Sequence, residues 1–187
     1  MTVMTLPFVD QISPDEIPTL SLRDVYEVHF DYVWRAVKRL GARPADQEDL
    51  VHDVFVTFMR TIDRYDTGRP IRPWLCGIAF RLVSTQRKRA SYQREIPVAE
   101  HVEASSNPDP SKAYESSQKK KWVNQALHQL PEEERDIIVL VDLLGHSVVE
   151  ASGILSTNEN PLYSRLRKAR KTLMSALRKL GAIGGGA

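Results

Sequence analysis

The chain has 187 residues, 42% of them hydrophobic, and a formal net charge of +2 at pH 7. This length and composition support one folded domain or two small ones and exclude a chain that is disordered throughout. The single cysteine, Cys76, excludes an internal disulfide and fits a reducing cytoplasm, and no stretch is apolar enough for membrane insertion.

Residues 1–20 combine three prolines with three acids and lack the basic start of a secretory signal peptide. We expect a flexible leader there. Helical spacing of apolar side chains begins after Ser21, a candidate N-cap, and continues to Leu40. Gly41 is expected to end this first helix.

A second helix is predicted from about Ala45 to Ile62, because its apolar residues form a wide face at helical spacing. The acids at its start can simply complement the positive end of the helix dipole. Asp49, His52 and Asp53 lie further along and share the exposed side. They are therefore candidates for a docking surface that binds a basic protein partner.

A third helix is predicted from Trp74 to Arg89, and the surrounding stretch 68–94 contains no acid. We favour a core role for Trp74 over base stacking, since large aromatic side chains are usually buried. The basic end of the helix is expected to point away from the core. With Tyr65 and Tyr92 nearby, it combines cations and aromatic rings, a combination that grips unstacked bases.

Residues 93–114 are rich in proline, serine and acids without periodicity and are predicted to be a linker. The linker divides the chain into two small helical domains, residues 21–92 and 115–181, followed by a flexible tail, 182–187. The predicted fold class is therefore all-α.

A helix-turn-helix is predicted in the second domain. One helix runs from Pro131 to Gly145, a second starts at the capping box of Ser147 and Glu150, and a third follows Asn158. The outer face of the third helix gathers Ser164, Arg165, Arg167, Lys168, Arg170 and Lys171, and no acid follows residue 160. A cationic second helix is what this motif places in a DNA major groove. The alternative is an ordinary solvated face, but such faces usually interleave acids with bases.

Motifs for catalysis are missing from the sequence, which has no glycine-rich phosphate loop, no paired cysteines or histidines and no serine nucleophile motif. We therefore expect no catalytic residue, no metal, no cofactor and no small-molecule substrate.

Four segments resemble the extracytoplasmic-function sigma factors of the bacterial sigma-70 family. They are DQEDLVHDVF (46–55), WLCGIA (74–79), LPEEER (130–135) and YSRLRKAR (163–170). The resemblance implies an initiation factor that brings core RNA polymerase to promoters. Its first domain would bind and help to melt the −10 element, and its second would read the −35 element as duplex.

The resemblance also implies residue roles. Asp49, His52 and Asp53 correspond to the contact with the polymerase clamp helices. The −10 segment would comprise Arg72, Trp74, Arg81, Ser84, Arg87, Lys88 and Arg89, and the −35 recognition helix would present Ser164, Arg165, Arg167 and Lys168. Arg81 and Thr85 stand where asparagine and aspartate are frequent. An anti-sigma factor is a further expected partner.

Two other functions fit the same pattern. A helix-turn-helix regulator would act without being a polymerase subunit, since the motif occurs on many scaffolds. A helical adaptor would bind proteins only, and its basic faces would be solvated. Copurification with core polymerase distinguishes a sigma factor from the regulator. For the adaptor, charge reversal at Arg167 and Lys168 would leave the function unchanged.

Overall fold

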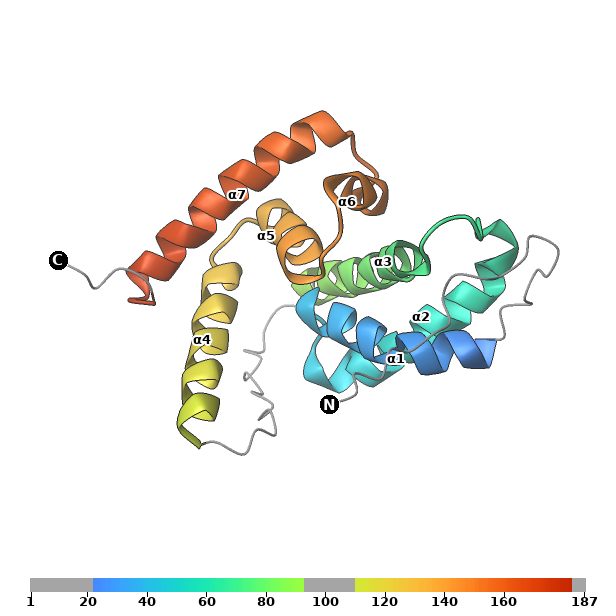
Figure 1. Ribbon diagram of the computed structural model, residues 1–187, viewed down its shortest axis with the longest axis horizontal. Helices are drawn as coiled ribbons and strands as arrows, with labels where there is room; N and C mark the ends of the chain where they lie inside the picture. The colour runs from blue at the N-terminus through green and yellow to red at the C-terminus, as the bar shows by residue number, and fades with distance from the viewer. Residues whose placement is uncertain (1–21, 93–109, 183–187) are drawn as a thin grey trace, which may run out of the picture.

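The computed structural model describes residues 22–92 and 110–182, and all regular structure in these two ranges is helical (Figure 1). The all-α prediction is confirmed. The predicted leader 1–20, most of the predicted linker and most of the tail lie outside the described residues. The helices are α1 (Leu22–Arg39), α2 (Gln47–Thr61), α3 (Ile71–Tyr92), α4 (Pro110–His128), α5 (Glu132–Ile138), α6 (Val148–Leu155) and α7 (Glu159–Lys179).

The first three helices pack against one another around an apolar core. Gly41 adopts a φ of +92° after α1, as expected of a residue that ends a helix in the left-handed region. A short 3-10 turn, Pro44–Asp46, leads into α2. The third helix starts at Ile71, three residues before the predicted start. Pro73 is tolerated there because the first turn of a helix has no intrahelical N–H bonds to lose.

The C-terminal helices form the predicted helix-turn-helix with two differences. Pro131 is the N-cap of α5 instead of its first helical residue. Helix α5 continues as a π-helical turn, Val139–Leu143, before Gly145 reverses the chain at a φ of +79°. The capping box of Ser147 and Glu150 starts α6 as predicted. Helix α4, which packs against α7, begins at Pro110 and so overlaps the predicted linker 93–114 by five residues.

The N-terminal group of helices and the C-terminal group pack against each other, whereas the sequence predicted two separate domains joined by a linker. Helix α6 lies against α3, and one apolar cluster contains buried side chains from both groups (Figure 1). The two helices lie close at Gly77, where an added methyl group would be 3.9 Å from Cγ1 of Ile154, an ordinary van der Waals contact. The apolar face of α6, with Ala151 and Ile154, is therefore shared between its own domain and α3.

Hydrogen bonds also cross this domain interface. Tyr32 of α1 and His146, which follows the π-helical turn, are both buried, and the Tyr32 hydroxyl lies 2.7 Å from Nε2 of His146. The guanidinium of Arg39 donates to the backbone carbonyl of Leu143. A domain interface that buries polar groups keeps its geometry because each buried group needs its partner.

The imidazole of His146 makes the domain packing sensitive to acid. Burial lowers the pKa of His146 below its usual 6.5, and the Glu150 carboxylate, 3.7 Å from Nδ1, opposes this only in part. The other groups near the ring are the Tyr32 hydroxyl, whose pKa burial raises, and Arg72, whose guanidinium lies over the Tyr32 ring. Burial also raises the pKa of the Cys76 thiol beside Tyr32 to about 12. His146 is thus the group of this cluster whose lowered pKa couples the packing to acid.

We expect the packed state to be fully stable above pH 6.5 and to lose stability as the pH falls below it, because the lowered pKa means that the packed state binds a proton less readily. The measurement is urea unfolding at about pH 7.5 and about pH 5.5 for the wild type and for His146→Phe. His29, whose pKa burial also lowers, contributes to both proteins, so the difference between them reports on His146. Equal losses in both would contradict the assignment.

Candidate nucleic-acid interface

The outer face of α7 carries an exposed polar strip that starts at the turn after α6. Ser164, Arg167 and Lys171 are all exposed, at the spacing that places them on one side of a helix. No acidic side chain of the described residues pairs with Arg167 or Lys171. The Ser164 hydroxyl donates to the Pro161 carbonyl, 2.9 Å away, which leaves its oxygen able to accept. This strip fits the face that a recognition helix presents to DNA.

Tyr163 is an exposed aromatic side chain next to this strip that the sequence interpretation passed over. Its side chain is 54% exposed, although large aromatic residues are usually more buried. Helical spacing alone indicates that Tyr163 lies next to the strip, because a step of 100° per residue places residue 163 beside residues 160 and 167.

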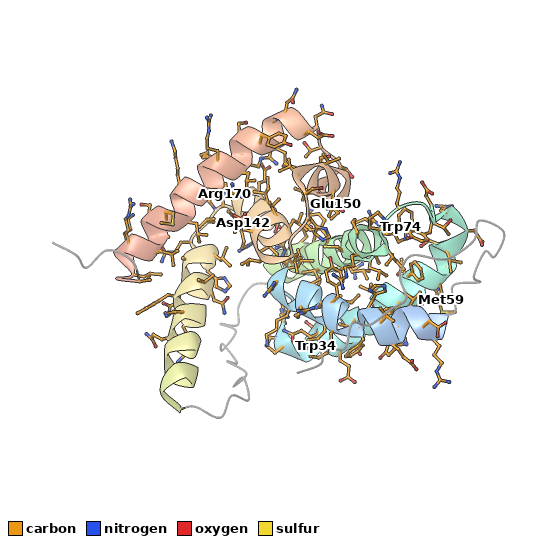
Figure 2. All side chains as sticks on the ribbon, in the orientation of Figure 1. Trp34, Met59, Trp74, Asp142, Glu150 and Arg170 are labelled. Carbon is orange, nitrogen blue, oxygen red and sulfur yellow. The ribbon has the colours of Figure 1, made fainter. Side chains whose placement is uncertain are left out.

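Three other cations of α7 are paired with acids, so the prediction of an unpaired cationic face is wrong for them. Arg165 lies 3.1 Å from Glu133, and Lys168 lies 2.8 Å from Glu134. Arg170 makes two hydrogen bonds to Asp142, at 2.6 and 3.0 Å, and the two side chains meet between α7 and the π-helical turn that follows α5 (Figure 2). These acids lie outside α7, so the pattern of residues along α7 gives no sign of them.

Glu134 is the most buried of these acids, with 6% of its side chain exposed. Its hydrogen bond to Lys168 lowers the pKa of the Glu134 carboxyl below its usual 4.5. The ammonium of Lys168 therefore binds one oxygen, Oε1, of a buried carboxylate whose Oε2 has no hydrogen-bond partner, while most of the lysine side chain stays exposed. Lys168 has a structural partner before it meets any nucleic acid.

Most of the predicted −10 residues lie along α3 and are accessible. Arg72, Arg81, Lys88 and Arg89 are exposed, and Ser84 is half-buried. Trp74 lies near the start of α3 (Figure 2), half-buried, with its ring edge-on to that of Tyr65 at a centroid distance of 5.9 Å. Its indole Nε1 has no hydrogen-bond partner. Trp74 thus packs against the core, as favoured, while part of its ring remains accessible.

Arg87 is the exception, because it points into the domain interface and not away from the core as predicted. Its side chain is 16% exposed, and its guanidinium makes two hydrogen bonds to Asp136 of α5, at 2.9 and 3.0 Å. It also lies 3.0 Å from a carboxylate oxygen of Glu132 and donates to the Leu40 carbonyl at 3.0 Å. The terminal nitrogens of the guanidinium are thus engaged, and Nε, which has no partner, is buried, so Arg87 offers DNA no accessible donor in this arrangement.

The predicted docking residues of α2 do share one exposed side. Asp49, His52 and Asp53 are exposed, whereas Leu50, Val51 and Val54 between and beside them are buried. The helix therefore presents an acidic surface on the side opposite to its core packing.

A metal-binding cluster and a membrane-spanning helix are not observed in the part of the chain that the structure describes. Among residues 22–92 and 110–182, no three histidine, cysteine, aspartate or glutamate side chains are grouped so that they could hold a metal ion. None of the helices in these ranges combines the length and apolarity that crossing a membrane requires.

Two protein-family models match the chain: sigma-70 region 2 over residues 25–92 and sigma-70 region 4 over residues 120–173. Together they cover well over half of the sequence. The chain belongs to the sigma-70 family. It is an extracytoplasmic-function sigma factor, a DNA-binding factor that directs RNA polymerase to start transcription at specific promoters.

Individual relatives agree with this assignment. The chain is 26% identical over 147 residues to the RNA polymerase sigma factor NccH of Alcaligenes xylosoxydans xylosoxydans, covering 76% of this chain and 79% of that one. It is 28% identical over 163 residues to the sigma factor SigL of Mycobacterium tuberculosis, covering 86% and 90%. The fold is similar to that of the sigma factor RpoE from Bartonella quintana, solved in complex with the anti-sigma factor NepR. That similarity has a TM-score of 0.66 at 20% identity and covers 83% of this chain and 98% of that one.

The two neighbouring cations Lys168 and Arg167 are expected to differ in what they do for stability. Lys168→Ala should destabilise the folded chain at pH 7, because it leaves the Glu134 carboxylate without its ammonium partner, whereas Arg167→Ala should not. Since the Glu134 pKa is lowered, this contribution is present above pH 4.5 and fades as the pH falls below it. Urea unfolding at pH 7 and in acid should therefore show the Lys168→Ala and wild-type curves converging. Equal stability of all three proteins at pH 7 would contradict the role of the pair.

Proposed function

We propose that the sigma factor reads the −35 element with α7 and the −10 element with α3, while α2 docks on core RNA polymerase. The observation that carries the proposal is the exposed strip of Ser164, Arg167 and Lys171 on the second helix of a helix-turn-helix. This geometry suits a major groove, with Arg167 and Lys171 near phosphates or base edges. Tyr163, beside the strip, offers an apolar contact to a base edge.

The paired cations of α7 take a secondary part in this proposal. Arg165 and Lys168 already have carboxylate partners on α5, so a phosphate must compete with Glu133 and Glu134 for them. Exchanging one ionic partner for another yields less than pairing a free cation. The exposed cations without a partner therefore supply most of the affinity.

The −10 element would be held by the exposed cations of α3 together with Trp74. Arg72, Arg81, Lys88 and Arg89 offer charge to the phosphate backbone, and Ser84 offers a hydroxyl. The accessible part of the Trp74 ring, beside the Tyr65 ring, provides an aromatic surface for an unstacked base. Arg87 joins these contacts only when it leaves Asp136.

The acidic side of α2, with Asp49, His52 and Asp53, is proposed to bind a basic surface of core polymerase. The chain would act in the cytoplasm as a non-enzymatic subunit. Because the Bartonella quintana relative is solved with an anti-sigma factor, we propose an anti-sigma factor as a partner of this chain too. Residues 21–92 and 115–181 remain the proposed region 2-like and region 4-like domains.

Replacing either cation of the exposed strip on α7 should weaken promoter binding in a salt-dependent manner. Arg167→Ala and Lys171→Ala are each expected to lower the slope of log affinity against log salt by about 0.9, the share of one phosphate contact. Binding of reconstituted holoenzyme to a promoter fragment across a salt series measures this slope. Lys179→Ala, in the last turn of the same helix and far from the turn after α6, is the matched control. If both strip variants keep the wild-type slope, Arg167 and Lys171 do not contact phosphates.

Reversing charge on α2 should abolish polymerase binding without unfolding the chain. Asp49→Arg is expected to lose copurification with core polymerase and run-off transcription, because it opposes a basic partner with like charge. Circular dichroism should remain that of the wild type, since Asp49 is exposed. Asp63→Arg, an exposed change just beyond α2, serves as the control. If Asp49→Arg still copurifies and supports transcription, the docking surface lies elsewhere.

A further inference from the structure

The C-terminal ends of α1 and α3 lie side by side in the first domain (Figure 1). A terminal nitrogen of Arg87 on α3 donates to the Leu40 carbonyl at 3.0 Å. A Cβ added to Gly41 would lie 3.8 Å from Cδ of Arg87. The residues that follow Arg87 on α3 are therefore neighbours of those that surround Leu40 at the end of α1.

Both of these segments lack acidic residues. Residues 32–45 contain four cations and no aspartate or glutamate, and residues 68–94 contain no acid either. Folding thus joins two acid-free segments that are far apart in the sequence. We call the surface that they form the basic end of the first domain. It comprises the exposed side chains of Arg35, Arg39, Arg43, Lys88 and Arg89.

The charge of the basic end is not neutralised within the described part of the chain. None of its five cations forms an ion pair with a carboxylate of the described residues. Arg35 and Arg39 donate only to backbone carbonyls, those of Asp31 and Leu143, which carry no net charge. The two carboxylates of α5 that face this end are bound to Arg87. The basic end therefore keeps a positive charge that a polyanion can neutralise.

Arg43 is held in a fixed position on this surface. It precedes Pro44, and its backbone is extended, with φ −63° and ψ 142°, as a residue before proline prefers. The buried side-chain amide of Gln47 anchors the turn by donating to the Ala42 carbonyl at 3.2 Å. A cation on an anchored turn loses less conformational freedom on binding than one on a mobile loop.

We propose that the basic end binds the phosphate backbone of the duplex directly upstream of the −10 element. The inference rests on the proposed function for its position on the promoter, but not for the binding of duplex phosphates. The aromatic surface for an unstacked base lies near the other end of α3, at Trp74 (Figure 2). Lys88 is about 21 Å further along the same helix, or roughly six base pairs of duplex. The melted DNA is held at Trp74, so the basic end faces the DNA that stays double-stranded toward the −35 element.

Phosphates suit this surface better than base edges do. The five cations are spread over two helix ends and the turn after α1, whereas a groove is read by side chains that line one face of a helix or ribbon. Contacts to phosphates fix the position of a protein on a duplex without reading its sequence. The basic end would thus set the register of α3 on the −10 element.

The first test uses the free, full-length chain and a non-specific duplex of about 20 base pairs, measured across a salt series. Arg43→Ala should lower the slope of log affinity against log salt by about 0.9, the share of one phosphate. Arg43→Lys should keep the wild-type slope, because it keeps the charge. Arg23→Ala, at the opposite end of α1 and paired with Glu27, is the matched control. A wild-type slope for Arg43→Ala, with a circular dichroism spectrum like that of the wild type, would overturn the proposal.

A second test locates the contact on the promoter. Reconstituted holoenzyme is bound to a promoter fragment in which neutral methylphosphonates replace the phosphates over about one half-turn, roughly five base pairs, upstream of the −10 element. The wild type should bind this fragment more weakly than the native one. Arg43→Ala should show a smaller difference between the two fragments, because one of its contacts is already missing. Equal differences for both proteins would overturn the position upstream of the −10 element.

Copurification separates a DNA contact from a contact with an acidic protein. We expect Arg43→Ala to copurify with core polymerase as the wild type does. Loss of copurification together with an unchanged salt slope would assign the basic end to a protein partner and overturn the proposal. If the wild-type holoenzyme does not distinguish a native −10 element from a scrambled one, the proposed function fails. The duplex measurement needs neither polymerase nor promoter, so it still decides whether the basic end binds phosphates.

Discussion

The acidic turn of α5, which comprises Glu132, Glu133, Glu134 and Asp136, determines which cations of the molecule are paired. Glu134 and Asp136 are buried carboxylates in a helix that otherwise contributes apolar residues to the core. Removing a carboxylate from water is costly unless cations and hydrogen bonds replace the water. Lys168 provides the replacement for Glu134 and Arg87 for Asp136, so the sequence of α5 requires cations from both α3 and α7 to lie close by.

Apolar packing and polar pairing contribute different things to this interface. The packing of α6 on α3 is favourable but carries little directional information, since burial of apolar surface depends mainly on its area. The bidentate pair of Arg87 with Asp136 and the hydrogen bond of Tyr32 to His146 fix one orientation. An interface built this way can be stable when closed and still be opened by a competitor for its few polar groups.

Local signals predicted much of the fold. Gly41 and Gly145 mark the ends of helices because they adopt positive φ, and the capping box of Ser147 and Glu150 marks the start of α6. Each of these signals depends on residues within one turn of the helix end, so a single sequence contains them. The all-α class and the helix-turn-helix follow from such signals together with helical spacing.

The partners of the cations depend on tertiary structure and could not be read in the same way. Arg87 meets Asp136 across 49 residues, and Arg170 meets Asp142 across 28. Helical spacing shows which residues of a helix share a face but not which other helix covers that face. The absence of acids in the last part of the chain therefore suggested free cations, although the acids that pair with three of them lie earlier, in α5 and in the π-helical turn after it. For the same reason the sequence alone could not show that Lys168 is paired with an acid while Arg167 and Lys171 are not. Nor could it show that Arg87 is paired while Arg81 is exposed.

The small net charge of +2 is consistent with this division of the cations. Acids and bases are segregated along the chain, and folding brings part of each set together at the acidic turn of α5. Apart from Arg178 and Lys179 in its last turn, α7 keeps only Arg167 and Lys171 without an acidic partner. These are too few charges for tight binding to a polyanion, since affinity grows with the number of neutralised phosphates. The cations of α3 can add to this strip only when one DNA molecule reaches both helices. A factor with this charge distribution gains its affinity for DNA from an assembly that holds its two domains apart at the spacing of the two elements, because linked contacts reinforce one another only when geometry lets them act together.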